Sequence, residues 1–102
     1  MSQHSRPESV RQAIIEQLQT VIDPETGADV WRMRLVEDLT VDADGHVSYG
    51  FRPSSPLCPI AILLALAIKE AVGDTPGVTK QTIQVRGFVQ AVQLAAFLNG
   101  QG

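Results

Sequence analysis

The chain has 102 residues, of which 44% are hydrophobic, 19% charged and 5% aromatic. This composition predicts a single globular domain over residues 1–102 and excludes wholesale disorder. The net charge of −3 argues against general nucleic-acid binding, because it repels phosphate backbones. A single cysteine excludes an intramolecular disulfide, and the longest apolar run, 59–68, is half the length of a membrane span. We therefore expect a cytoplasmic protein that binds neither nucleic acid nor membrane.

The first predicted element is an amphipathic helix after a short N-terminal tail, residues 1–7, which we expect to be mobile. Ser5 and Glu8 have the spacing of a capping box. The helix must end before Pro24, because proline cannot continue the hydrogen-bond ladder. Residues 22–27 then form a predicted loop. The apolar residues that recur with the period of a helix are Val10, Ala13, Ile14, Leu18 and Val21.

Residues 35–42 show the alternation of a strand with one buried face. An Asp-Gly pair at 44–45 suits a tight turn, and residues 47–51 return as a second strand of a hairpin. The two alternating sets in the first strand are Val36, Asp38, Thr40 and Asp42 on one face and Leu35, Glu37, Leu39 and Val41 on the other.

The second half of the chain begins with a proline-rich segment, 53–59, which predicts a stiff loop. Residues 60–72 form a predicted helix that is apolar nearly all round, so it must be covered on more than one side, by the sheet and by another helix or a subunit. A third strand is predicted over 81–85, followed by a short amphipathic helix that ends at Asn99. The apolar residues of that helix are Phe88, Ala91, Val92, Ala95 and Leu98. The order α-β-β-α-β-α predicts an α/β (α+β) two-layer sandwich.

Cys58 is the residue with the most reactive chemistry. It directly precedes Pro59, and proline favours the first position of a helix, so the sulfur is expected at a helix N-terminus. Unpaired amides and the helix dipole at that position lower the pKa of a thiol from about 8.5. The resulting thiolate binds metals and attacks electrophiles. The alternative interpretation is a small apolar residue that caps a buried helix.

Two short segments carry the other candidate site residues. Ser54 and Ser55 can donate hydrogen bonds to the Cys58 sulfur or its ligand, or can simply form turns. Asp23 and Glu25 form a carboxylate pair that can reach a metal or accept a proton, or can form a solvated turn or cap near Thr26. Spacing alone does not show whether the two segments meet.

Two histidines and one tryptophan are further candidates for a metal site or a partner-binding surface. His4 and His46 lack the paired spacing of a zinc site and are expected to be solvated. Trp31 with Arg32 and Arg34 is either a partner-binding surface or a partly buried aromatic beside two cations, and we favour the second interpretation.

Four short motifs together resemble the MIP18 family, also called DUF59, which contains iron–sulfur cluster assembly proteins of the SufT and PaaD type. These motifs are Ile-Asp-Pro-Glu at 22–25, Leu-Val at 35–36, Asp-Gly at 44–45 and Ser-Ser-Pro-Leu-Cys-Pro at 54–59. The resemblance covers roughly residues 8–86. It departs from the family where Arg34 replaces a glycine, where Ser54 replaces a threonine, and after Arg86.

The resemblance implies a fold like that of an iron–sulfur cluster assembly domain, and a role in maturing clusters or delivering them to client proteins. It implies Cys58 as the metal-contacting thiolate. It also implies that a single cofactor-binding site is formed by Asp23, Glu25, Thr26, Ser54, Ser55 and Cys58.

One cysteine limits how a cluster is held, because clusters usually take four protein ligands. The chain therefore holds an iron–sulfur cluster only transiently or between subunits, which makes a homodimer a possible state. The expected partners are client apo-proteins and other assembly components.

Three functional classes follow from these residues. We rank a non-enzymatic assembly or trafficking factor first. A cysteine enzyme, with Cys58 as nucleophile and Asp23 or Glu25 as base, ranks lower because no histidine is well placed to act as base. The third class is an adaptor without metal that helps to assemble a multicomponent oxygenase.

Overall fold

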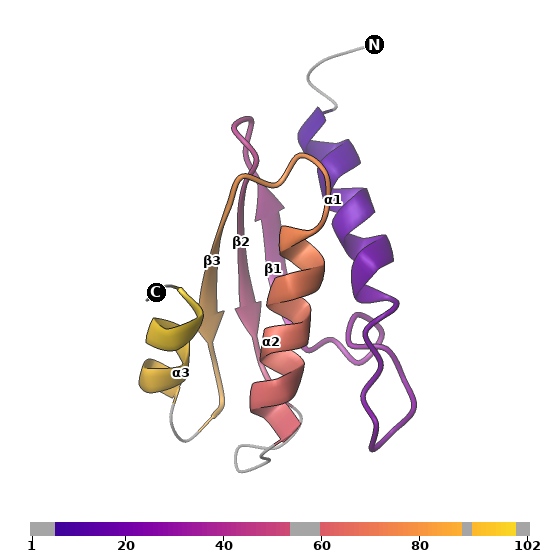
Figure 1. The fold of residues 1–102 in the computed structure, drawn as a ribbon, viewed down its shortest axis with the longest axis vertical. Coiled ribbons are helices and arrows are strands. Elements are labelled where there is room, and N and C mark those ends of the chain that lie inside the picture. The colour runs from indigo at the N-terminus through magenta and orange to yellow at the C-terminus, as the bar shows by residue number, and fades with distance from the viewer. Residues whose placement is uncertain (1–5, 54–59, 89–90, 100–102) are drawn as a thin grey trace.

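The computed structural model describes residues 6–53, 60–88 and 91–99. The predicted element order and fold class are confirmed, with two helices packed on one face of a three-stranded sheet and the third helix beside the edge strand β3 (Figure 1). The elements are α1 (Arg6–Leu18), β1 (Val36–Val41), β2 (His46–Phe51), α2 (Ile60–Gly73), β3 (Lys80–Val85) and α3 (Ala91–Leu98).

The sheet has the strand order β1-β2-β3. β1 and β2 form the predicted hairpin and are antiparallel, whereas β2 and β3 are parallel and are connected through α2. Parallel pairing requires such a crossover, and it brings the carboxyl ends of β2 and β3 together, with Phe51 opposite Val85. α1 and α2 run in opposite directions, so the carboxyl end of α1 and the amino end of α2 also lie at this end of the molecule (Figure 1).

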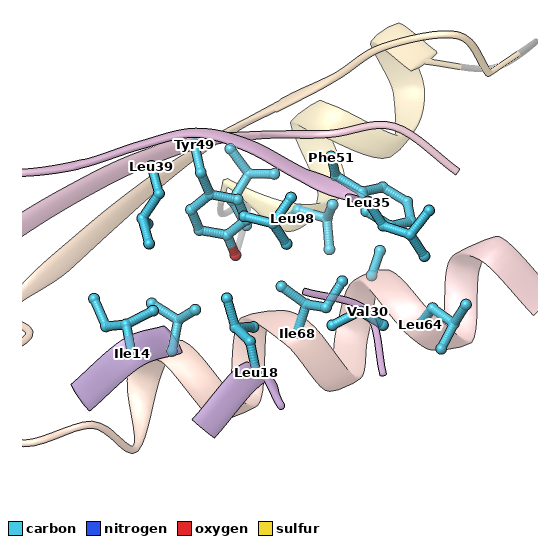
Figure 2. Close-up of a cluster of buried hydrophobic side chains, with 14 of the residues drawn as sticks. Ile14, Leu18, Val30, Leu35, Leu39, Tyr49, Phe51, Leu64, Ile68 and Leu98 are labelled. Atoms are coloured by element: carbon cyan, nitrogen blue, oxygen red, sulfur yellow. The ribbon is translucent and has the colours of Figure 1, made fainter. Parts of the chain in front are cut away.

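The core lies between the sheet and the two helices that cover it. Figure 2 shows side chains of β1 and β2 facing those of α1 and α2, with Val30 pointing into the same layer. Each buried aliphatic or aromatic side chain contributes about 1.5–3 kcal/mol. The facing side chains are Leu39, Tyr49 and Phe51 from the strands, Ile14 and Leu18 from α1, and Leu64 and Ile68 from α2.

The start of α1 agrees with the predicted capping box at Ser5 and Glu8, whereas its end comes earlier than the apolar period through Val21 predicts. The helix begins at Arg6, inside the segment 1–7 expected to be a tail; residues 1–5 lie outside the described residues. It ends at Leu18 and not near Val21, because the Thr20 hydroxyl and backbone N–H both donate to the carbonyl of Gln17, at 2.6 and 3.0 Å, and so tighten the last turn.

The strict alternation predicted for the first strand is also wrong. The β1–β2 register shifts between Glu37 and Thr40, and Asp38 has a φ of 54°, which places a bulge in β1. Val36 and Leu39 are therefore both buried although they are three residues apart.

The predicted apolar face of α3 is confirmed at Leu98 but wrong at Val92, and it omits Leu94. Val92, expected to be buried, is 81% exposed, whereas Leu94 and Leu98 are buried. Asn99, directly after the helix, explains part of this orientation. Its side-chain amide accepts from the N–H of Ile83 and donates to the carbonyl of Ile83, both at 2.7 Å, and so occupies the free edge of β3.

Candidate functional site

The two predicted site segments differ in what the structure describes. Asp23, Glu25 and Thr26 lie in the described loop between α1 and β1. Ser54, Ser55 and Cys58 lie outside the described residues, so their roles stay predictions. The residues that flank the second segment, Pro53 and Ile60, are described.

Asp23 is a buried carboxylate that organises its own loop. Its side chain is 2% exposed, and Oδ1 accepts the backbone N–H of Glu25 at 2.8 Å, which closes a turn around Pro24. Its backbone N–H donates to the carbonyl of Ala28 at 2.9 Å, and its carbonyl accepts from Gly27 at 2.8 Å. The turn interpretation is thus the observed local structure of this carboxylate.

Glu25 and Thr26 are exposed on the same loop, unlike Asp23. The Thr26 hydroxyl accepts from the N–H of Ala28 and donates to the sulfur of Met33, both at 3.2 Å. The predicted carboxylate pair is therefore split into one buried group that shapes the loop and one exposed group, Glu25, that is open to a ligand.

Three backbone hydrogen bonds connect the ends of this loop to Arg52, shortly before the second segment. Val30 donates to Val21 at 2.9 Å, Leu35 donates to Val30 at 3.1 Å, and Arg52 donates to Leu35 at 2.8 Å. Arg52 directly precedes Pro53. The loop that carries Asp23 and the chain that leads into the Cys58 segment therefore start from one hydrogen-bonded base.

An ion cluster at the same end of the sheet was not predicted. Arg52 and Arg86 follow β2 and β3, whose ends are aligned, and both bind Glu37 at 2.9 Å. Arg86 also binds Asp38 at 2.8 Å. Hydrogen bonds from Arg86 and then Arg52 lower the pKa of Glu37. The signal that sequence reasoning missed is an arginine directly after each of two neighbouring parallel strands.

The ion cluster predicts a pH dependence of stability. Because the folded protein holds the pKa of Glu37 below its ordinary value of 4.5, this contribution is present above pH 4.5 and is lost as the pH falls through the folded pKa. We expect Glu37→Gln to be less stable than the wild type at neutral pH and low salt, and the two urea midpoints to converge in acid. Glu16→Gln, at an exposed position of α1, is the matched control. A wild-type advantage that persists in acid would contradict this account.

Across the described residues, no three His, Cys, Asp or Glu side chains converge as ligands for a metal ion. His46, expected to be a solvated turn residue, is partly exposed at the start of β2, where its Nε2 lies 2.8 Å from the Thr82 hydroxyl.

Comparison with known proteins identifies the family. The model of a family described as "Iron-sulfur cluster assembly protein" matches residues 11–85, which span both site segments. The chain belongs to this family.

Relatives and a solved structure agree with the family match. The chain is 31% identical over 78 residues to the Fe-S protein maturation auxiliary factor YitW of Bacillus subtilis, covering 76% of each chain. It is 34% identical over 79 residues to an uncharacterized protein of Methanocaldococcus jannaschii, covering 78% of this chain and 83% of that protein. A crystal structure of a DUF59 domain from Bacillus anthracis superimposes with a TM-score of 0.71 at 22% identity, covering 92% of this chain and 97% of the other. The predicted family and fold are therefore confirmed.

Arg34, one of the departures from the family, adopts a backbone conformation that favours glycine. Arg34, where the resemblance predicts glycine, has a φ of 62°. This left-handed conformation costs a residue with a side chain about 1–2 kcal/mol. Arg34 is exposed and lies beside half-buried Trp31, whose carbonyl accepts the Arg34 N–H at 3.0 Å. The expectation of a partly buried Trp31 is thus met.

A helix that crosses a bilayer needs about 20 predominantly apolar residues. None of the helices in the described ranges is both long and apolar enough to span a membrane.

Proposed function

We propose that the chain is an auxiliary factor in the maturation of iron–sulfur proteins, which delivers clusters, or helps to insert them, through the Cys58 thiolate. The match to the iron–sulfur assembly family across residues 11–85 carries this proposal, because the match includes both site segments. A relative of similar length is named as a maturation auxiliary factor, which supports the same role. The common base of the two segments, from Val21 to Arg52, supports a composite site.

The cluster is cargo in this proposal. One cysteine supplies a quarter of the four protein ligands that a cluster usually takes. The remaining coordination comes from small thiols, from a client apo-protein or from a second copy of the chain. Such incomplete coordination favours release, which suits a carrier.

The other site residues divide by exposure. Asp23 positions the loop, because its Oδ1 is already used by the N–H of Glu25. Glu25 and Thr26 are exposed and can offer oxygen atoms to the cargo beside Cys58. Ser54 and Ser55 are proposed to donate hydroxyl hydrogen bonds to the thiolate or its ligand.

Anaerobic reconstitution with iron and sulfide tests the thiolate role. We expect the wild type to gain visible charge-transfer absorption and Cys58→Ser to lose it, because the alcohol does not ionise to replace the thiolate at neutral pH. Far-UV circular dichroism checks that the variant is folded, and Ser9→Ala on α1 is the control that keeps the absorption.

Retained absorption in Cys58→Ser would overturn the proposed role of the thiolate. If the variant also keeps its biological activity while changes at Trp31 or Arg34 abolish that activity, the adaptor hypothesis is the correct one.

A further inference from the structure

The outward face of α2 is apolar and uncovered in the described part of the chain. The sequence predicts that this helix is covered on several sides. The sheet, α1 and α3 cover only part of its circumference. Leu63 is 63% exposed, Ile62 39% and Leu66 38%. At 3.6 residues per turn, these three side chains share one face of the helix.

The same face continues into an acidic end. Glu70 lies on this side of α2, after Leu63 and Leu66. Asp74 lies just beyond Gly73, the last residue of the helix. Together they line an open hollow of about 680 Å³ with Ala67 and Gln81. Neither carboxylate forms an ion pair within the described residues, and Lys69 is the one cation that lines the hollow, which leaves one net negative charge.

The wall of the hollow is held in place by hydrogen bonds. Burial raises the pKa of Tyr49, so its hydroxyl stays protonated and donates to Oε1 of Gln81 at 2.9 Å. Nε2 of Gln81 in turn donates to the carbonyl of Lys69 at 2.9 Å. β2, β3 and α2 are thus joined at the hollow, so the surface is preformed and does not have to be ordered by a partner.

We propose that this groove, formed by exposed Ile62 and the residues that line the hollow, docks a helical segment of a partner in cluster maturation. The segment carries an apolar stripe that covers Ile62, Leu63 and Leu66, and one or more basic residues about two turns further on that reach Glu70 and Asp74. From Leu63 to Glu70 the helix rises about 10 Å, which sets this spacing. Only the identity of the partner, as a client or an assembly component, rests on the proposed function.

A second copy of the chain stacked in parallel on this groove brings like charges together. In a parallel register, Glu70 faces Glu70 and the two carboxylates repel each other. A partner segment that places cations against Glu70 and Asp74 meets the acidic end without this repulsion.

The position of the groove suits transfer of a cluster. α2 begins at Ile60, two residues after Cys58 in the chain, so a segment over Ile62 and Leu63 lies within about one helical turn of the start of α2. Docking there holds a client near Ile60, which follows Cys58 by two residues in the chain.

Fluorescence anisotropy with two synthetic stapled helical peptides tests the proposal. Both peptides carry leucines at steps of three and four; one has lysines two turns beyond this stripe and the other has glutamates. We expect the lysine peptide to bind about tenfold more tightly at low salt. Leu63→Ser should weaken binding about tenfold, and Glu70→Gln with Asp74→Asn should remove the preference for lysine. Val92→Ser, at an exposed apolar residue of α3 outside the groove, is the matched control.

Three outcomes would overturn the proposal: no binding of either peptide, equal binding of both, or equal losses in Leu63→Ser and Val92→Ser. A concentration-dependent dimer in sedimentation that Leu63→Ser dissociates would also overturn it, in favour of a second copy. Cys58→Ser should bind the lysine peptide as the wild type does, so failure of the docking proposal and failure of the thiolate role are distinguishable.

Discussion

Gly45→Ala is expected to destabilise the protein by about 3 kcal/mol, a large part of the stability of a small domain. Gly45 has a φ of +84°, which costs alanine about 1–2 kcal/mol. A Cβ at this position would also clash with the backbone carbonyl oxygen of Gly77, and no side-chain rotation relieves that clash. Overpacking of this kind costs typically a further 1–3 kcal/mol.

The close approach at Gly45 connects two turns that are far apart in sequence. The N–H of Thr79 donates to the carbonyl of Gly45 at 2.9 Å, and its hydroxyl donates to the carbonyl of Asp44 at 2.8 Å. The hairpin turn is thereby held against the connection between α2 and β3. Displacing it is expected to loosen the parallel pairing of β2 with β3 as well.

Gly27→Ala is the matched control for this prediction. Gly27 has a φ of +77°, but nothing lies within 4 Å of the added Cβ, so this variant reports the conformational cost alone. Urea unfolding of the two variants, each compared with the wild type, separates the clash from the backbone strain. Equal losses of unfolding free energy in the two variants would show that the clash relaxes at no cost.

Asp23→Ala is expected to lower the free energy of unfolding by about 1–3 kcal/mol, because it removes a side chain that is only 2% exposed and takes the acceptor from the part-buried hydrogen bond of the Glu25 N–H. Asp23→Asn keeps an oxygen in the same place and should retain most of the stability. Glu25→Ala, at the exposed neighbour, should stay within about 0.5 kcal/mol of the wild type.

Comparing these three variants decides what the buried carboxylate does. Unfolding in urea gives the stability, and reconstitution with iron and sulfide gives the effect on cargo binding. We expect Asp23→Ala to impair both and Glu25→Ala to impair only the second. If Asp23→Asn were as unstable as Asp23→Ala, the charge of Asp23, and not its acceptor oxygen, would be what the loop requires.

Much of the site architecture could not be predicted from the sequence, for specific physical reasons. The motif around Asp23 predicts a loop, but burial of that carboxylate depends on the backbone bonds to Gly27 and Ala28. The ion cluster of Glu37, Arg52 and Arg86 depends on the parallel register of β2 and β3, which periodicity does not reveal.

Tertiary contacts also overrode local pattern within elements. The bulge in β1 buries Val36 and Leu39 together, where alternation places them on opposite faces. In α3 the amide of Asn99 binds the edge of β3, so that Leu94 and not Val92 meets the core. In each case the sum of long-range contacts outweighs a local preference worth less than about 1 kcal/mol per residue.

By itself, the sequence determined the order of helices and strands, the hairpin, the apolar character of α2 and, through four short motifs, the iron–sulfur assembly family. These properties depend on periodicity, turn chemistry and local residue identity, all of which act between neighbours in the chain. Only the tertiary structure decided that backbone hydrogen bonds connect Val21, Val30, Leu35 and Arg52, and that the described residues leave one face of α2 uncovered. Those properties depend on which segments meet, and that is decided by packing of the whole core and not by any one stretch of chain.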